Sequence, residues 1–318
     1  MKKSFKLWTW TFVAMGLWSL GFIYNVYLSG FPSSLRHNYK IKAALASKIE
    51  QPKIIIAGGS GVHYTINSHV MERNLGIPVI NFGTNGGIGL NVLLPSIIDH
   101  VNSGDIVLLI LEYPLILNKD GFDDLSATFG ITINRPGLGG VNTKDIVETT
   151  LTLGTPSLQA LIKTAQDLLQ EGRIDYFGDP LTNRGDATIE LTRVSSWWKM
   201  PIRSSISQHS IETLQQFKKD VEAKGASLMF SLPVIYASDD DETLANIQKT
   251  ADVLSEIAPI VYNRETLNIK DDSNLFADTH YHLKIPARIT RSEELAAQLK
   301  MKIPQVLSIS QENSPKLR

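Results

Sequence analysis

The sequence predicts an α/β protein, a three-layer sandwich around a parallel sheet of about five strands, preceded by one N-terminal transmembrane helix. Two observations predict the sheet. Short, nearly uninterrupted apolar runs at Ile54–Ile56, Pro78–Phe82 and Asp105–Tyr113 are typical of strands buried on both faces. Segments of helical periodicity, Ser68–Leu75 and Ile88–Val101, separate these runs, and such an alternation indicates βαβ units.

The transmembrane helix is predicted by an uncharged, aromatic-rich run from Leu7 to Ser29. Its 23 residues would span about 30 Å of hydrocarbon, and no cleavage site of the signal-peptide type follows. Residues 1–30 are therefore expected to be an uncleaved, single-pass anchor in the cytoplasmic membrane. Three lysines precede the run and Arg36, Lys40 and Lys42 follow it, so the positive-inside rule is nearly tied. The short N-terminal tail favours a cytoplasmic N-terminus and an exported globular domain.

The rest of the chain divides by composition. Residues 31–51 begin with the breaker cluster Gly30–Ser34 and are expected to form a stalk. Residues 52–304 are expected to form the α/β domain. Its alternation lapses at about 114–205, which predicts an insertion or lid over the sheet edge. The alternation resumes with a helix at Ser207–Lys224, strands at Ser227–Ile235 and Pro259–Tyr262, and a last helix at Pro286–Leu299. Residues 305–318 are expected to form a tail.

Composition excludes several classes of function. Of the residues, 43% are hydrophobic, enough for a packed core. The net charge is −1 and no basic cluster occurs, so nucleic acid is not an expected partner. The chain has no cysteine, which excludes disulfides, Cys-ligated zinc and thiol catalysis. We expect no metal and no cofactor.

The first strand ends in a turn around one hydroxyl. Gly58, Gly59 and Gly61 free the backbone on both sides of Ser60. A serine there stands at the carboxyl edge of a parallel sheet, where α/β proteins place their sites, and nearby N–H groups could hold an oxyanion. Ser60 could instead cap the next helix, or the loop could cradle a phosphate. The dinucleotide-binding pattern fails because Tyr64 stands where its last glycine belongs, and no P-loop sequence follows.

One stretch offers a base for this serine. A serine hydroxyl is a poor nucleophile unless a base takes its proton and another group orients that base. Asp278 stands next to His280 and His282, just before the last helix. Spacing leaves both histidines open, because residues four apart share a side of a helical turn and residues two apart share a side of an extended loop. The cluster could also be half of a metal site, but no other cluster completes it.

The order of these features resembles the SGNH (GDSL-like) superfamily of esterases and acyltransferases, over about residues 52–113 and 206–300. The resemblance implies a flavodoxin-like SGNH fold with Ser60 as the nucleophile. It implies an oxyanion hole built from the backbone N–H groups of Ser60 and Gly86, with Gly83 as the other register for that glycine. In the family's last block an aspartate precedes the catalytic histidine, which maps to Asp278 and, preferably, to His282.

Two departures from the family pattern matter. The family spaces its last block as Asp-x-x-His, whereas His280 and His282 stand two and four residues after Asp278. The family's third block, Gly-x-Asn-Asp, supplies another oxyanion donor, but Glu112 follows the third strand here. Losing one such donor costs about 10²–10³ in rate, and an inward carboxylate would repel an oxyanion. Asn85 could fill the missing role. Membrane-anchored relatives that act on cell-surface polysaccharides often lack this block too.

The function that these features predict is a membrane-anchored O-acyl esterase or acyltransferase acting on a cell-envelope or exported glycan. Its expected partners are an acylated small molecule or glycan and the membrane. Two other classes stay open. One is a catalytically silent relative that binds polysaccharide or scaffolds an envelope assembly. The other is a phosphate or nucleotide binder that uses the Gly58–Gly61 loop.

Overall fold

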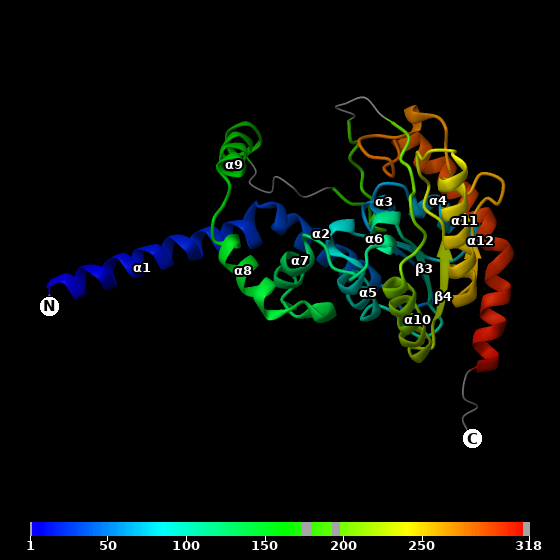
Figure 1. Ribbon diagram of the computed structural model, residues 1–318, viewed down its shortest axis with the longest axis horizontal. Coiled ribbons are helices and arrows are strands. Elements are labelled where there is room, and N and C mark those ends of the chain that lie inside the picture. The colour runs from blue at the N-terminus through cyan, green and yellow to red at the C-terminus, as the bar shows by residue number, and fades with distance from the viewer. Residues whose placement is uncertain (1, 173–179, 193–197, 314–318) are drawn as a thin grey trace, which may run out of the picture.

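The computed structural model describes residues 2–172, 180–192 and 198–313. At its centre lies a five-stranded, all-parallel sheet in the order β2-β1-β3-β4-β5 (Figure 1). The strands are β1 (Ile54–Gly58), β2 (Val79–Gly83), β3 (Ile106–Ile110), β4 (Ser227–Ser231) and β5 (Ile260–Val261). The predicted fold class, an α/β sandwich with a parallel sheet of about five strands, is confirmed.

Helices surround the sheet and extend from it. The α-helices are α1 (Lys2–Ile23), α2 (Phe31–Ser47), α3 (Ser60–His63), α4 (Ser68–Leu75), α5 (Leu90–Ile98), α6 (Tyr113–Leu117), α7 (Ser126–Thr132), α8 (Thr143–Leu153), α9 (Leu158–Glu171), α10 (Gln208–Ala223), α11 (Asp241–Ile257) and α12 (Ile285–Asn313). Shorter helical turns are η1 (Tyr24–Leu28), η2 (Gly86–Ile88), η3 (Leu138–Gly140) and η4 (Ser273–Leu275).

Alternate residues of β1 serve two separate cores. Ile55 and Ala57 pack in the larger core, under α2, α5, α10 and α11. Ile54 and Ile56 pack in the smaller core, under α4 and α12. Because successive side chains of a strand point to opposite faces, a strand covered on both faces must be apolar at every position. This explains the uninterrupted run Ile54–Ile56.

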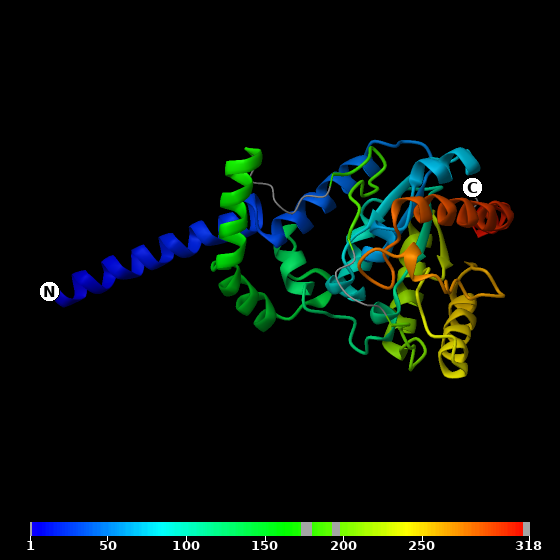
Figure 2. The ribbon, with the colours of Figure 1, turned by 90° about the horizontal axis from the view of Figure 1, so that it is seen from above.

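The N-terminal helix α1 projects away from the domain (Figures 1 and 2). Its side chains, including Leu7, Leu17 and Leu20, are largely exposed. Of the helices in the described ranges, it belongs to the one segment that is long and apolar enough to cross a membrane. Its length and its exposed apolar side chains are those of a helix that can span a bilayer.

The expected stalk, residues 31–51, mostly forms α2, and α2 packs against the sheet. Leu35, Tyr39 and Ala46 are buried in the larger core, and Lys42 is fully buried. The apolar positions are few and spaced at helical intervals, which explains why composition alone suggested a stalk. The helix α2 is therefore part of the packed core and not an extended connection.

The segment expected as an insertion, at about 114–205, packs against two different parts of the molecule. Its α7 packs beside α2, where the rings of Phe129 and Tyr39 lie 5.4 Å apart. Farther along, α8 and α9 reach back to the junction of α1 and α2 (Figure 1). Near its end, Asp186 is buried and accepts a hydrogen bond from Ser68 at the start of α4.

The last helix is longer than the sequence predicts. The expected helix Pro286–Leu299 corresponds to α12, which continues to Asn313 through Pro304. Part of the expected tail 305–318 is thus helical, and residues 314–318 lie outside the described ranges.

A buried ion pair joins the starts of β1 and β3. Lys53 Nζ lies 2.8 Å from Asp105 Oδ2, and both side chains are at most 1% exposed. Asp105 also accepts hydrogen bonds from the backbone N–H groups of Lys53 and Asn102. These bonds fix the two strands at the pairing Ile54 to Ile106. Removing one partner would leave the other charge buried and unpaired.

We expect Lys53→Met to lower the free energy of unfolding by about 3–5 kcal/mol, since it isolates the Asp105 carboxylate in the interior. Urea unfolding of the full chain in detergent measures this. The control is Lys218→Met, which removes an exposed pair with Glu222 and should cost less than about 1 kcal/mol. Equal losses for the two variants would contradict a structural role for the buried pair.

Candidate active site

The candidate site lies where the strand order reverses direction. The sheet order 2-1-3-4-5 places its switch point between β1 and β3, and crevices at such points hold the ligands of open α/β sheets. Three loops meet there: the turn after β1 with Ser60, the turn after β2 with Gly86, and Glu112 after β3. A side chain at Gly59 would lie 2.8 Å from Gly86 Cα and 2.6 Å from Glu112 Oε1. The three loops therefore need glycine at this contact.

Ser60 is the first residue of the short helix α3. Its side chain is half-buried, and Gly59 precedes it as the N-cap. In the described part of the chain, neither the Ser60 N–H nor the hydroxyl Oγ makes a hydrogen bond, although the Ser60 carbonyl accepts one from Tyr64 N–H. Both polar groups that a nucleophilic serine uses are thus available to a substrate.

Glu112 binds the two N–H groups that flank Ser60. Its carboxylate accepts hydrogen bonds from Gly59 N–H at 3.0 Å and from Gly61 N–H. The side chain is only 5% exposed. Burial raises the pKa of Glu112, while the two backbone N–H groups and His282 act in the opposite direction. The Glu112 side chain therefore points inward, beneath the serine turn.

A buried cation lies near this carboxylate. Arg291 of α12 and Glu112 both line a small cavity beside Gly61. Burial lowers the pKa of Arg291 to about 10, so the guanidinium is still charged at neutral pH. It donates a hydrogen bond to Ser231 Oγ at 3.0 Å.

The glycines after β2 differ in what their N–H groups do. Gly83 N–H donates to Asn81 Oδ1 at 2.9 Å, so it is already engaged. Gly86 N–H makes no hydrogen bond within the ranges that the structure describes. Asn85 Oδ1 accepts from Gly87 N–H and caps the short helix η2. Of the two registers for the oxyanion glycine, Gly86 is the one with a free donor.

The structure pairs Asp278 with one of the two histidines. His282 Nδ1–H donates to Asp278 Oδ1 at 2.7 Å, and the His282 residue is 6% exposed. A turn closed by Thr279 Oγ1, which accepts from His282 N–H, gives the loop this shape. His280 is half-buried, and its ring instead bonds the carbonyl of Trp198 at 2.9 Å. An aspartate on Nδ1 leaves His282 Nε2 unprotonated, as a general base requires.

The His282 ring lies close to the serine helix. It packs on Tyr64, with ring centroids 4.6 Å apart, and Tyr64 stands one helical turn after Ser60. No hydrogen bond joins His282 to Ser60 Oγ among the described residues. Catalytic hydrogen bonds are often absent in an unliganded site and form when substrate binds.

The buried side chain of Lys42 connects the serine helix α3 to strand β2. Lys42 Nζ donates to Gly83 O at 2.6 Å and to Asn81 Oδ1 at 3.3 Å, and it lies 2.9 Å from His63 Nδ1. Neither Lys42 nor Asn81 is an expected site residue from the sequence. The only signal was the period of α2, which places Lys42 on the same face as Tyr39 and Ala46.

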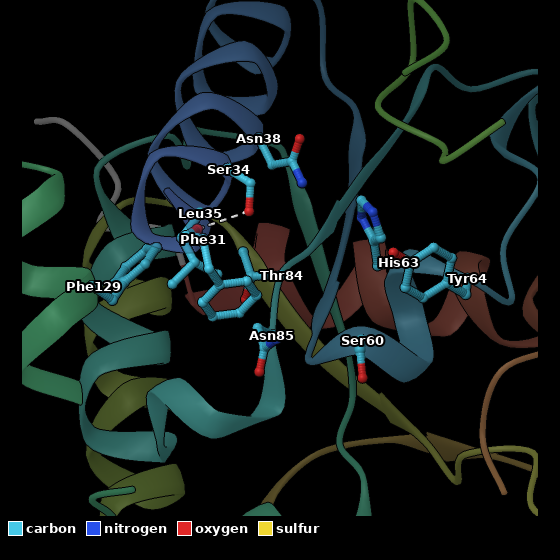
Figure 3. Close-up of a pocket in the computed structure, with 10 residues that line it drawn as sticks. All are labelled: Phe31, Ser34, Leu35, Asn38, Ser60, His63, Tyr64, Thr84, Asn85 and Phe129. Carbon is cyan, nitrogen blue, oxygen red and sulfur yellow. Dashed lines mark hydrogen bonds between the residues drawn. The ribbon is translucent and has the colours of Figure 1, made fainter. Parts of the chain in front are cut away.

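A cavity of about 170 Å³ opens beside Ser60. Ser60 and Asn85 line it, and their side chains point the same way in Figure 3, while α2 contributes Phe31, Ser34 and Leu35 to the lining. The lining mixes apolar rings with hydroxyl and amide groups, as ligand pockets commonly do. In the described ranges, no cluster of three or more His, Asp or Glu side chains could hold a metal ion.

The sequence matches no known protein family and no curated protein. Among solved structures, the chain is similar to protein YXIM from Bacillus subtilis, with 12% sequence identity and a TM-score of 0.37. The similarity covers 80% of this chain and 58% of that one, so this chain spans less than two thirds of that protein's length. Function is therefore inferred from the geometry of the site.

We predict that Glu112→Gln destabilises the domain by about 1–3 kcal/mol. Both oxygens of the Glu112 carboxylate accept a hydrogen bond, whereas only the oxygen of a glutamine amide can do so. The loss should depend on pH. The pKa of Glu112 is raised in the folded state, so the folded protein favours the protonated carboxyl. The stability of wild type relative to the variant should therefore increase as the pH falls and reach its maximum below about 4.5. This extra stability is lost as the pH rises through the raised pKa. Urea unfolding across this range measures the difference.

Glu72→Gln is the control, because the stability that Glu72 contributes should change with pH in the opposite direction. The hydrogen bond from Arg184 lowers the pKa of Glu72, so its stabilisation is present above about 4.5 and is lost as the pH falls through the lowered value. A Glu112 difference that stays constant with pH would contradict the buried position of the carboxylate.

Proposed function

We propose that this chain is a membrane-anchored serine O-acyl esterase or acyltransferase that acts outside the cytoplasmic membrane on an acylated glycan. The observation that carries the proposal is the hydrogen bond between His282 and Asp278, at the same sheet edge as Ser60. A serine on a tight turn, a histidine and an orienting aspartate are the groups that acyl transfer through a covalent intermediate requires.

The proposed reaction uses the side chains of Ser60, His282 and Asp278 together with two backbone N–H groups. Ser60 Oγ attacks the acyl carbonyl while His282 Nε2 takes its proton, and Asp278 holds the imidazole in the required tautomer. Ser60 N–H and Gly86 N–H bind the oxyanion of the tetrahedral intermediate, and the Asn85 amide is a further donor on that rim. His282 then protonates the leaving alkoxide. Water or a sugar hydroxyl finally takes the acyl group from Ser60, with His282 again as the base.

Glu112 is expected to lower the rate of ester turnover. It stands where the resemblance would place a neutral donor, and its carboxylate lies beneath the serine turn. One missing donor costs about 10²–10³ in rate, so we expect slow turnover of simple esters. The same feature favours a second candidate function, a catalytically silent polysaccharide binder, which differs from the first in having no activated serine.

A fluorophosphonate probe separates the two functions. It reacts with a serine whose proton is being removed and whose phosphoryl oxygen finds oxyanion donors. We expect labelling of the purified protein at Ser60 and none in Ser60→Ala, with the circular dichroism of the two proteins unchanged. A folded wild-type protein that takes no label, yet is retained on a polysaccharide column, would support the silent binder instead.

Substitution of the two histidines tests the base. His282→Ala should lower the hydrolysis of p-nitrophenyl acetate by about 10²–10⁴-fold, the usual contribution of a general base. His280→Ala is the matched control, because His280 lies two residues away but bonds Trp198 O rather than Asp278. Its activity should stay near that of wild type. A larger loss in His280→Ala would assign the base to the other histidine.

A further inference from the structure

Helix α9 carries a continuous apolar stripe that the domain does not cover. Its large members recur at helical spacing and are 43–86% exposed: Leu158, Leu161, Ile162, Leu168 and Leu169. The preceding helix α8 adds Val147 and Leu151, which are 51% and 61% exposed. So many exposed apolar side chains on neighbouring helices mark an interaction surface.

The other faces of α9 are already accounted for. One face is held to the junction after α1, where Tyr24 Oη lies 2.6 Å from Thr164 Oγ1 and donates to Ala160 O at 3.0 Å, and Ser29 Oγ lies 2.8 Å from Thr164 Oγ1. A third face presents three exposed glutamines to solvent: Gln159, Gln166 and Gln170. The helix therefore has one packed, one polar and one apolar face.

The contacts of α9 lie at one end of the apolar run of α1, at Tyr24 and Ser29. Counted from Leu7, about 26 Å of helix brings the chain to Tyr24, which is close to one hydrocarbon thickness. Helix α9 therefore meets the N-terminal helix at the depth of a membrane interface, where tyrosine is favoured. The end of α8 is joined to the same helix by Asn25 Nδ2, which donates to Leu153 O at 2.8 Å, and nearer the middle of the run by Trp18 Nε1, which donates to Leu151 O at 3.0 Å.

The direction of α9 agrees with this depth. Figure 2 shows α9 running across the line of α1 rather than along it. If α1 crosses a bilayer, a helix across its end lies in the plane of the bilayer surface. The side chains Leu17 and Leu20 of α1 are themselves 65% exposed, as expected of a helix that faces lipid.

We propose that α8 and α9 form an interfacial element whose apolar stripe is buried in the surface of a lipid bilayer. An amphipathic helix of this kind inserts its apolar face to the depth of the headgroup and acyl-chain boundary. The element fixes the orientation of the domain on the membrane, because hydrogen bonds tie it to the anchor. The inference rests on the proposed anchoring by α1, and its test includes a position that reports on the anchor separately.

The absence of native cysteine permits a single-site test in the full-length chain. Leu169→Cys on the stripe, Gln166→Cys on the polar face and Leu17→Cys in α1 are each labelled with bimane. Each protein is placed at one copy per phosphatidylcholine nanodisc, with ordinary or dibrominated acyl chains. Quenching by brominated lipid reports contact with acyl chains, and quenching by aqueous iodide reports contact with water.

We expect brominated lipid to quench the probe at positions 17 and 169 several-fold more than at position 166, and iodide to show the reverse order. If the probe at 169 is as open to iodide as that at 166 while position 17 is quenched by lipid, the interfacial element is wrong and the anchor stands. If position 17 is not quenched by lipid either, the anchoring itself fails. Disulfide-linked dimers of Leu169→Cys, together with iodide access in single-copy discs, would assign the stripe to a second copy of the chain.

Discussion

The carboxylate of Glu112 ties the end of β3 to the turn after β1 by accepting hydrogen bonds from Gly59 and Gly61. Much of the site depends on this interaction. It holds the turn so that the Ser60 N–H between the two bonded groups has no acceptor among the residues that the structure describes. It also requires glycine at 59 and 61, since a Cβ at either would meet the carboxylate. The cost is a negative charge beneath the position where an oxyanion would form.

The buried sheet could be predicted from the sequence because strands covered on both faces consist of uninterrupted apolar runs. The packing of α2 against the sheet could not be predicted. From the sequence, Lys42 is expected at the surface. Its burial is stabilised by His63, Asn81 and Gly83, which lie far away along the chain. The same limit applies to the site. Spacing left His280 and His282 equally able to reach Asp278, and the choice depends on a turn whose geometry Thr279 sets. The direction of the Glu112 side chain also follows from contacts far apart in sequence.

The N-terminal helix α1 and the candidate site are closer than a stalk would allow. The cavity beside Ser60 is walled by Phe31, Ser34 and Leu35, the first turns of α2, and α2 begins directly after η1. Phe31 is 40% exposed at this junction. With α8 and α9 on the bilayer surface, the cavity would stand close to the headgroups. An acyl group presented at the membrane could then reach Ser60 past the apolar wall of α2, without the domain swinging on a flexible linker.

The central claim is that Ser60 carries the acyl group between donor and acceptor, and trapping that intermediate tests it most directly. The protein is mixed with p-nitrophenyl acetate, quenched in acid within the first turnover and digested, and the peptides are weighed by mass spectrometry. The account predicts one acetyl group on the peptide that contains Ser60, and no such adduct in His282→Ala within the same time. A folded protein that releases nitrophenol while the Ser60 peptide stays unmodified would contradict it, as would an acetyl group found only on another side chain.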